Sequence, residues 1–284
     1  MKSQPRSYKL VDSGGFLKLE QVGPYTLVRP CPQAVWSPRL SASVWKKIDA
    51  KYERFSGGQG KWHVFNKAIP KEWEVEIDSV LFKARLTDFG HLGFFVEHAC
   101  RWTAIRDSLK SSSEPKRVLN LFGYTGAATI ACLQGGAEVV HVDASKASVA
   151  WARENADLND VSSRPVRWIV EDAQKFVSRE VRRGNQYDGV ILDPPSYGRG
   201  AKGEVWKIES DLPRLLESVF SLLQKDSFVL LSSHSNGYTP QALENLFHGQ
   251  LKDFPRLAGE MLISEGDGER SVPSGAFALI GSIN

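Results

Sequence analysis

The chain contains the stretch Tyr187-Asp188-Gly189-Val190-Ile191-Leu192-Asp193-Pro194-Pro195-Ser196-Tyr197, in which an apolar run stops abruptly at an acid and two prolines. Such a run is typical of a strand that is buried on both faces. Because proline fixes φ and lacks a backbone N–H, the pair ends the strand and leaves the carbonyls of Asp193 and Pro194 as outward-facing acceptors. The stretch predicts one of two structures: a rigid loop that binds a planar ring carrying an amino group, or a Pro-Pro turn with a packed tyrosine.

A second stretch, Val118–Ala128, predicts a strand, a turn that contains Gly123 and Gly126, and the start of a helix. This arrangement brings backbone close to a ligand. The third glycine of the dinucleotide fingerprint G-x-G-x-x-G is missing. The turn therefore favours a smaller, zwitterionic ligand over a pyrophosphate.

Acids follow three predicted strands. The strand over 137–142 ends at Asp143, where Rossmann-like folds bind ribose hydroxyls, and the strand over 166–170 ends just before Asp172 and Ala173. Each acid has an alternative role as the N-cap of the next helix, which is the favoured one for Asp172. In an open α/β sheet the carboxyl ends of the strands lie along one edge. Together with Asp193 and the glycine turn, the acids predict a cofactor crevice there.

Two domains are expected. The first, 1–90, has short alternating segments separated by Gly and Pro, a pattern typical of a small β-rich domain. In the second, 91–284, helix and strand patterns alternate from about Glu97 and predict a doubly wound parallel sheet. Ser145 is expected to cap a helix over Lys146–Asn159. Met261–Gly281 predicts a closing antiparallel hairpin.

Composition agrees with a cytosolic enzyme. The 284 residues are 42% hydrophobic, no apolar run approaches the ~20 residues of a membrane span, and no apolar signal core follows the first residues. Cys31, Cys100 and Cys132 lie far apart without metal-ligand spacing, so neither a disulfide framework nor a metal site is expected. The net charge of +3 permits an RNA partner without requiring one.

The order of the turn at 120–126, Asp143, Asp172 and the 193–197 segment resembles the motif series of class I S-adenosylmethionine-dependent methyltransferases, over roughly residues 80–284. The resemblance implies a Rossmann-like sheet with an antiparallel C-terminal hairpin, and S-adenosyl-L-methionine as the cofactor. It implies Asp143 beside ribose, Asp172 and Ala173 beside adenine, and Phe122–Gly126 beside the methionine part.

More narrowly, His91–His98 is similar to the Lys-Thr-Gly-x-Phe-x-Asp-Gln-Arg signature of bacterial large-subunit ribosomal RNA methyltransferases that modify cytosine C5 or guanine N7. Gly93, Phe95 and Glu97 match the signature. The departures are His91 for Lys, His98 for Gln and Ala99 for Arg. The loop 198–207 is similar to a subgroup in which Asp-Pro-Pro is followed by Gly-Arg-Gly and Gly-Glu-Val-Trp.

The resemblance implies three groups of site residues. The expected catalytic residues are Asp193, Pro194 and Tyr197. The expected cofactor-binding residues are Phe95, Glu97, Asn120, Phe122, Gly123, Tyr124, Thr125, Gly126, Asp143, Asp172, Ala173 and Asp193. The expected substrate-binding residues are Pro195, Arg199, Lys202 and Lys207.

The acceptor atom depends on a segment further along. Methylation of pyrimidine C5 usually needs a thiolate, and relatives with that activity carry a Ser-Cys-Ser-like segment after the next strand, where this chain has Ser232-Ser233-His234-Ser235. Ser233 at the nucleophile position disfavours the C5 route. His234 is either a base or a polar residue bonded to backbone at the strand end.

We therefore expect a methyltransferase that acts on a base nitrogen, most directly in ribosomal RNA, with the N-terminal domain as the RNA-docking platform. One alternative is an NAD(P)-dependent oxidoreductase, which Asp143 favours and the incomplete glycine pattern opposes. Another is a non-catalytic RNA-binding protein with a relic cofactor site. The sequence leaves the oligomeric state open.

Overall fold

The computed structural model describes residues 6–55, 59–200, 203–250, 254–266 and 268–281. The chain divides into two compact units, Met1–Glu97 with Leu262–Ser274, and His98–Met261 with Gly275–Asn284. This division lies seven residues beyond the predicted boundary at 90, and it assigns the tip of the C-terminal hairpin to the first unit. Sequence pattern marks where helices begin, whereas the units are defined by contacts that join distant parts of the chain.

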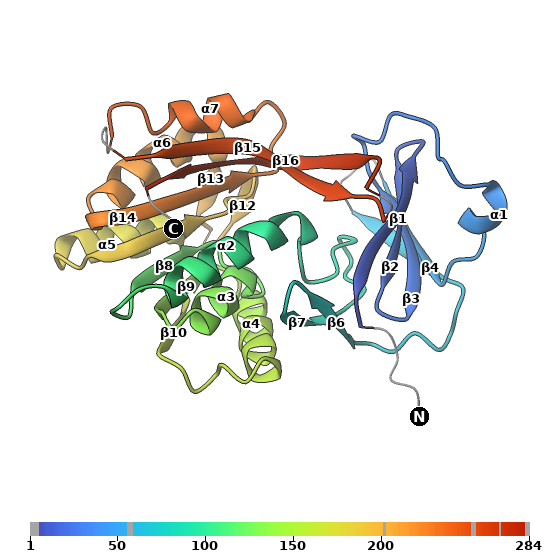
Figure 1. Ribbon diagram of the computed structural model, residues 1–284, viewed down its shortest axis with the longest axis horizontal. Coiled ribbons are helices and arrows are strands. Elements are labelled where there is room, and N and C mark those ends of the chain that lie inside the picture. The colour runs from blue at the N-terminus through green and yellow to red at the C-terminus, as the bar shows by residue number, and fades with distance from the viewer. Residues whose placement is uncertain (1–5, 56–58, 201–202, 251–253, 267, 282–284) are drawn as a thin grey trace. The chain divides into compact units, whose positions relative to one another are not determined.

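The first unit is built of strands, as the sequence predicted (Figure 1). A five-stranded sheet has the order β1-β2-β3-β4-β5, in which only β3 and β4 pair in parallel. Two more strands, β6 and β7, form a hairpin, and α1 is a single turn. The bounds are β1 Tyr8–Gly14, β2 Leu17–Val22, β3 Tyr25–Pro30, α1 Ala42–Trp45, β4 Ala50–Arg54, β5 Gly60–Val64, β6 Trp73–Ile77 and β7 Val80–Ala84.

The second unit contains the predicted parallel sheet. Its seven strands have the order β10-β9-β8-β11-β14-β16-β15, in which the first five run parallel and β16 is antiparallel to β14. The chain leaves β8 toward one edge of the sheet and later returns to build the other, so the order reverses between β8 and β11. The bounds are β8 Arg117–Leu121, β9 Glu138–Asp143, β10 Val166–Val170, β11 Tyr187–Leu192, β14 Leu223–Ser233, β15 Arg256–Ser264 and β16 Ser271–Ile280.

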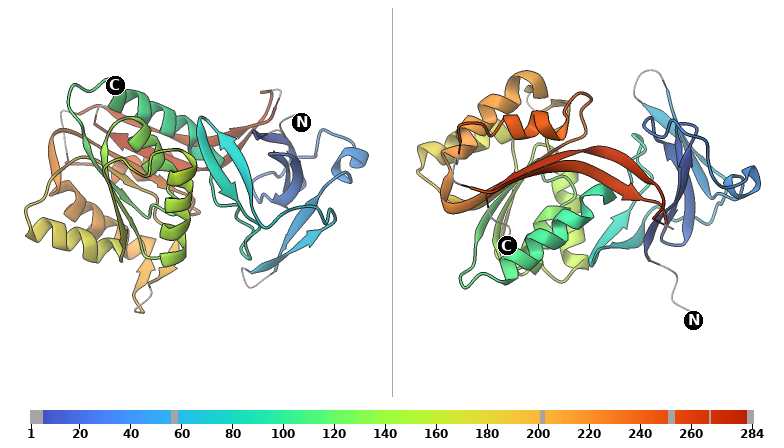
Figure 2. Two further views of the ribbon diagram at one scale, coloured as in Figure 1. Left: turned by 90° about the horizontal axis from the view of Figure 1, so that it is seen from below. Right: turned by 45° about the horizontal axis from the view of Figure 1, so that its top comes forward.

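Helices cover both faces of this sheet (Figures 1 and 2). One face carries α2, α3 and α4, and the other carries α5, α6 and α7. Ser145 caps α4 as predicted, since its side chain accepts the backbone N–H of Ser148. The bounds are η1 Val96–His98, α2 Ala99–Lys110, α3 Ala127–Gln134, α4 Lys146–Leu158, α5 Ala173–Arg182, α6 Ile208–Phe220 and α7 Pro240–Asn245, with the short strands β12 Tyr197–Arg199 and β13 Val205–Lys207 between α5 and α6.

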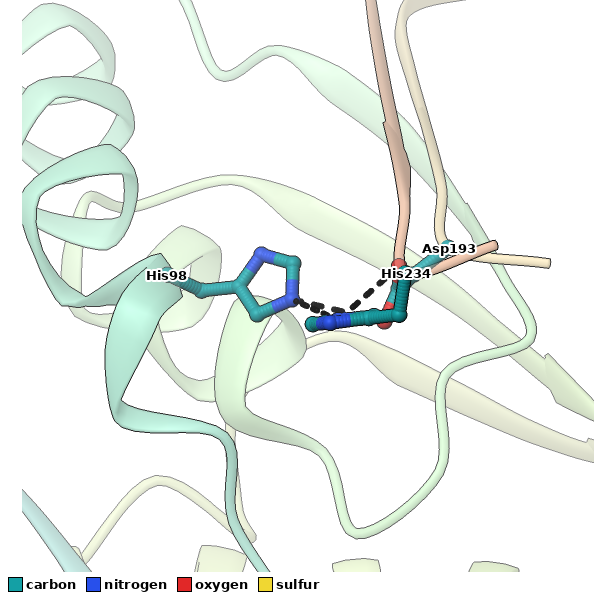
Figure 3. A group of neighbouring side chains, drawn as sticks. All are labelled: His98, Asp193 and His234. Atoms are coloured by element: carbon teal, nitrogen blue, oxygen red, sulfur yellow. Dashed lines mark hydrogen bonds and ion pairs between the residues drawn. The ribbon is translucent and has the colours of Figure 1, made fainter. Parts of the chain in front are cut away.

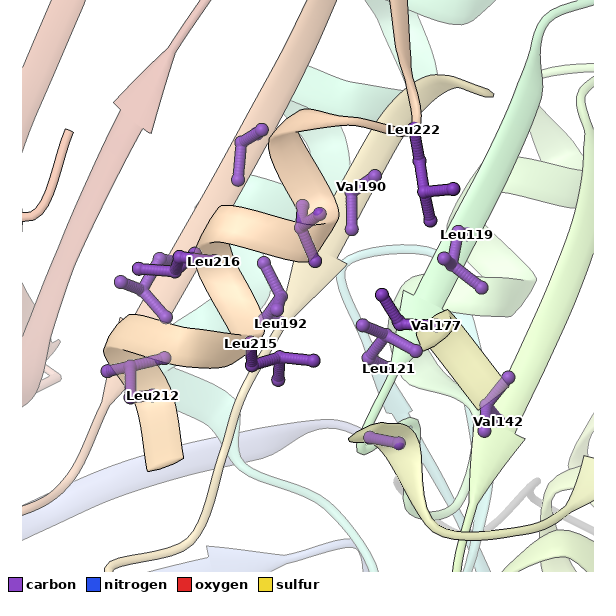
Figure 4. Close-up of a cluster of buried hydrophobic side chains, with 14 of the residues drawn as sticks. Leu119, Leu121, Val142, Val177, Val190, Leu192, Leu212, Leu215, Leu216 and Leu222 are labelled. Atoms are coloured by element: carbon purple, nitrogen blue, oxygen red, sulfur yellow. The ribbon is translucent and has the colours of Figure 1, made fainter. Parts of the chain in front are cut away.

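The core between the sheet and α5 and α6 fixes the site-bearing strand ends (Figure 4). Alternate residues of β8 and β11 face these helices, and α6 contributes apolar residues at helical spacing to the same core. The labelled members are Leu119, Leu121, Val142, Val177, Val190, Leu192, Leu212, Leu215, Leu216 and Leu222. Because both faces of the strands are covered, their carboxyl ends and the loops that follow are held in place. No helix among the described residues has the length and apolar character needed to cross a membrane.

Candidate active site

The turn after β8 is held in an unusual backbone conformation. Phe122 and Tyr124 have φ of 55° and 47°, and Gly126 has φ of 90°. A positive φ at a bulky residue costs of the order of 1–3 kcal/mol, and such residues cluster at ligand sites. A Cβ added to Gly123 would lie 2.5 Å from Cε1 of His141, so this position is packed too closely for a side chain. The turn therefore presents backbone at the point where the sheet order reverses.

Asp143 anchors this turn from the end of β9. Its Oδ2 accepts the backbone N–H of Tyr124 at 2.9 Å, and its Oδ1 accepts that of Ser145 at 2.8 Å. Burial raises the pKa of Asp143, although both hydrogen bonds act in the opposite direction. A carboxylate can accept about four hydrogen bonds, so Asp143 retains acceptor capacity for hydroxyl groups of a ligand.

Asn120, near the end of β8, supports the turn through a buried hydrogen-bond network. Its side-chain amide donates to Thr129 Oγ1 at 2.9 Å, and the same hydroxyl lies 2.9 Å from His141 Nδ1. All three residues are buried, and burial lowers the pKa of His141 to about 3, which keeps the ring neutral. This network joins β8, α3 and β9 under the turn. Thr125 is also buried, and its carbonyl accepts a hydrogen bond from the Asn155 side chain.

Asp172 caps α5, as the favoured alternative predicted. Its Oδ1 accepts the backbone N–H of Lys175 at 2.9 Å, and Ala173 is buried in the first turn of the helix. The neighbouring Glu171 forms a two-bond ion pair with Arg179. The loop after β10 is thus held by the Glu171–Arg179 ion pair and by the Asp172 cap.

Asp193 lies at the end of β11 beside two histidines (Figure 3). Its Oδ1 accepts a hydrogen bond from Ser232 Oγ at 2.7 Å and lies 3.8 Å from His234 Nε2, and its Oδ2 lies 3.4 Å from His98 Nε2. Burial raises the pKa of Asp193. The charges of His98 and His234, with hydrogen bonds from His98 and Ser232, outweigh burial and hold the pKa well below its usual range.

The Pro-Pro turn is stiffened by hydrogen bonds. Pro195 was expected to bind substrate, and its carbonyl accepts the indole N–H of Trp206 at 2.7 Å. Tyr197 is 50% exposed, and its hydroxyl accepts a hydrogen bond from Arg199 Nε at 2.9 Å. The described part of the loop 198–207 contains the antiparallel pair β12–β13, and Trp206 packs on Phe122 with ring centroids 4.9 Å apart. The Asp193 turn and the glycine turn are therefore joined through one tryptophan.

The structure places the remaining predicted residues as follows. Arg199 and Lys207 are exposed on β12 and β13, and Lys202 lies outside the described residues. Phe95 and Glu97 belong to the first unit, where the Phe95 ring lies against His91 and Glu97 is buried. Pro194 lies within the turn. Sequence reasoning missed the place of His98 at this site, because His98 was treated only as a departure from a signature.

Comparisons with known proteins agree with this architecture. Residues 27–243 match the family model described as S-adenosylmethionine-dependent methyltransferase. The crystal structure of an S-adenosylmethionine-dependent methyltransferase from Agrobacterium tumefaciens is 34% identical, with a TM-score of 0.91 over 99% of this chain and 96% of that chain. The chain belongs to the S-adenosylmethionine-dependent methyltransferase family. Membership confirms the expected cofactor and reaction class, and does not favour the oxidoreductase alternative.

Two further comparisons place this methyltransferase among its relatives. The ribosomal RNA large subunit methyltransferase K/L of Pseudoalteromonas translucida is 31% identical over 166 residues, which are 58% of this chain and 23% of that protein. The chain thus spans about a quarter of the length of the curated relatives that it matches. The structure of SMU.776 in complex with SAH has a TM-score of 0.74 over 98% of this chain and 76% of that chain, and at 18% identity it shows a shared fold.

Proposed function

We propose that this methyltransferase modifies a nitrogen atom of a base in ribosomal RNA. The observation that carries the proposal is the Asp193 carboxylate, oriented by Ser232 and followed by a rigid turn that ends in the half-exposed Tyr197. A carboxylate and an aromatic face in one turn suit a planar ring with an amino group. The names of the K/L relatives support ribosomal RNA as the acceptor, and a cytoplasmic location follows from that acceptor.

The residues of the turn would act mainly by position. S-adenosylmethionine supplies an electrophilic methyl group when bound. Asp193 accepts an N–H of the acceptor amine and favours the positive charge that develops on its nitrogen. Tyr197 offers a stacking face, a contact worth roughly 1–3 kcal/mol per base. Pro194 and Pro195 remove two backbone N–H groups and fix φ, so the turn keeps its shape without the ligand.

The proposed cofactor contacts follow from the turn and the acids. In this proposal the Phe122–Gly126 backbone adjoins the methionine part, Asp143 accepts the ribose hydroxyls, and Asp172 with Ala173 adjoins adenine. The donor set fits the cofactor, because Asp143 has spare acceptor capacity and the Gly123 backbone is not shielded by a side chain. Asn120 acts through Thr129 and His141 as a support of the turn. The cofactor contacts expected of Phe95 and Glu97 stay predictions.

The structure supports nitrogen over C5 as the acceptor atom. Ser233 is buried, and its hydroxyl accepts the backbone N–H of Ser235 at 3.1 Å. Cys132 is buried, and burial raises the pKa of its thiol to about 12, so it carries no reactive thiolate. Cys100 is exposed in the first turn of α2, two residues after His98, a spacing at which side chains do not share a face.

The first unit has a surface suited to single-stranded RNA. Phe55 follows β4 and Phe65 follows β5, so they lie at opposite ends of this strand pair, and they are 51% and 61% exposed; Lys61 is exposed on β5. Exposed aromatic side chains stack bases, and nearby cations bind phosphates. We propose this β4–β5 surface as the docking platform, with Arg199 and Lys207 of the second unit as further phosphate contacts.

The test is transfer of labelled methyl from S-adenosylmethionine to total RNA from a strain that lacks the gene. Expected is label in a product sensitive to RNase and resistant to protease, with nucleoside analysis showing an N-methylated base. Asp193→Asn should lower the rate about 100-fold or more, as loss of a group that stabilises developing charge does. Asp226→Asn, at an exposed position near the start of β14, is the matched control.

Each contrary outcome changes a particular part of the proposal. Label in a protease-sensitive product would replace RNA with a protein acceptor. C5-methylated cytosine that disappears in Cys100→Ser would overturn the nitrogen assignment. Full transfer by Asp193→Asn would remove Asp193 from catalysis.

A further inference from the structure

Three side chains from three separate elements converge at the ends of β11 and β14. His98 closes η1 before α2, Asp193 follows β11, and His234 follows β14. Nε2 of His98 and Nε2 of His234 lie 3.2 Å apart, and each faces one oxygen of the Asp193 carboxylate, at 3.4 and 3.8 Å. Figure 3 shows both imidazole rings directed toward the space beside this carboxylate.

These separations match the spacing of ligands around one ion. Zinc binds histidine nitrogen and carboxylate oxygen at 2.0–2.2 Å, so two ligands at the tetrahedral angle lie about 3.4 Å apart. The two histidine nitrogens are 3.2 Å apart and lie 3.4 and 3.8 Å from different oxygens of the carboxylate, and one ligand atom of each residue lies within 4.8 Å of the others. The chemistry agrees, because two imidazoles and a carboxylate suit Zn²⁺ and other first-row transition metals, whereas Mg²⁺ and Ca²⁺ prefer oxygen ligands.

The surroundings also suit a metal centre. Ser232 donates a hydrogen bond to Asp193 Oδ1 and orients the carboxylate, as partners of metal ligands do. The three side chains are 12%, 28% and 32% exposed, in the order His98, Asp193 and His234, so an ion can enter from solvent. Three protein ligands with solvent access are typical of zinc sites that keep a coordination position open.

We propose that His98, Asp193 and His234 form a binding site for one divalent transition-metal ion. Zn²⁺ is the preferred ion. One coordination position is left for water or for an oxygen of the acceptor. The cysteine spacing, from which no metal site was expected, does not bear on this site, since its ligands are histidines and an acid. The ion would lie beside the turn proposed to hold the acceptor base, and would fix the carboxylate in one orientation.

The test is metal binding to the full-length, tag-free protein after treatment with a chelator. Calorimetric titration with ZnCl₂ should give one site per chain, and Co²⁺ should produce the visible absorption of a four-coordinate nitrogen and oxygen site. His98→Ala and His234→Ala should each weaken Zn²⁺ binding by more than about 100-fold, beyond the 10- to 100-fold loss typical of partners outside the ligand set. His248→Ala, an exposed histidine of the same unit, should bind like the wild type.

A second measurement keeps the inference testable if a variant fails to fold. X-ray absorption of the zinc-loaded wild type should show two imidazole nitrogens and an oxygen at about 2.0–2.2 Å. Absence of a one-to-one site in the wild type, or Zn²⁺ affinity that both alanine variants retain, would leave a hydrogen-bonded histidine pair and overturn the proposal. Neither experiment uses methyl transfer, so failure of the metal site and failure of the proposed function are distinguishable.

Discussion

The carboxylate of Asp143 accepts the backbone N–H of Tyr124 at 2.9 Å, and Tyr124 has a φ of 47°. The acid at the end of β9 thus holds a strained residue of the turn after β8. The energy of a hydrogen bond to a charged group, about 1.5–3 kcal/mol, is comparable with the cost of a positive φ at a non-glycine residue. Asp143 therefore has a structural task in addition to its proposed contact with ribose.

Asp143→Asn should weaken cofactor binding by about tenfold or more and lower the free energy of unfolding by about 1–2 kcal/mol. The N–H groups of Tyr124 and Ser145 bond to different oxygens of Asp143, so in the variant one of them would face the NH₂ group of the amide. Calorimetric titration with S-adenosylmethionine and urea denaturation measure the two effects. Asp157→Asn, exposed on α4, is the control, and equal binding by both variants would contradict the assigned role.

Gly123→Ala should abolish measurable cofactor binding, because its Cβ would lie 2.5 Å from His141 Cε1 and displace the turn. Gly136→Ala is the control that separates the effect of a steric clash from that of backbone strain. Gly136 also has a positive φ, of 90°, but a Cβ at this position would meet open space. It should lose about 1 kcal/mol of stability and keep its affinity. Cofactor titration and thermal unfolding of both variants provide the comparison. Wild-type affinity in Gly123→Ala would show that the turn tolerates a side chain.

Trp206→Phe should slow methyl transfer by about tenfold while cofactor affinity stays close to that of the wild type. The variant keeps an aromatic ring against Phe122 but loses the hydrogen bond to the Pro195 carbonyl, so the acceptor turn is held less firmly. Trp73→Phe loses a similar bond, to the Val22 carbonyl, within the first unit, and should lower stability without changing kcat. Identical kcat values for the two variants would refute the positioning role of Trp206.

The fold could be predicted because local pattern and topology agree. The apolar runs of β8, β9 and β11 are buried on both faces, and covered parallel strands are what such runs predict. The acids Asp143 and Asp193 were found by their position at strand ends, which is a property of the sequence. The limits of the two units could not be read from pattern, because Leu262–Ser274 is assigned by contacts with residues early in the chain.

Residues that act through distant partners were beyond sequence reasoning. His98 and His234 are far apart in the chain: the pairing of β11 with β14 brings His234 to the carboxylate of Asp193, and His98 reaches it from the end of η1. The cofactor contact expected of Asn120 stays a prediction, and the bond of its amide to Thr129 could not be predicted because it depends on how α3 packs on β8. The hydrogen bond from the Trp206 indole to the Pro195 carbonyl likewise depends on packing between elements. Side-chain pairing across elements is set by packing and is not encoded in local spacing.

A buried charged cluster in the first unit gives a prediction about stability. Glu20 is fully buried, forms a two-bond ion pair with Arg29 at 2.6 and 2.7 Å, and accepts a hydrogen bond from the Tyr8 hydroxyl at 2.8 Å. Lys18 lies 3.1 Å away. Burial raises the pKa of Glu20, but the charges of Arg29 and Lys18 and the hydrogen bonds outweigh it and lower the pKa to about 2.

Glu20→Gln should cost about 3–5 kcal/mol of stability at pH 7, since it removes the two-bond ion pair of the largely buried Arg29. Because the pKa of Glu20 is depressed in the folded state, its contribution is complete above its ordinary pKa of 4.5 and is lost as the pH falls toward 2. The difference between wild type and variant should therefore narrow between pH 5 and pH 3 in urea denaturation. Glu53→Gln, exposed on β4, should change stability by less than about 1 kcal/mol. A difference independent of pH would show that Glu20 is not held ionised by its cations.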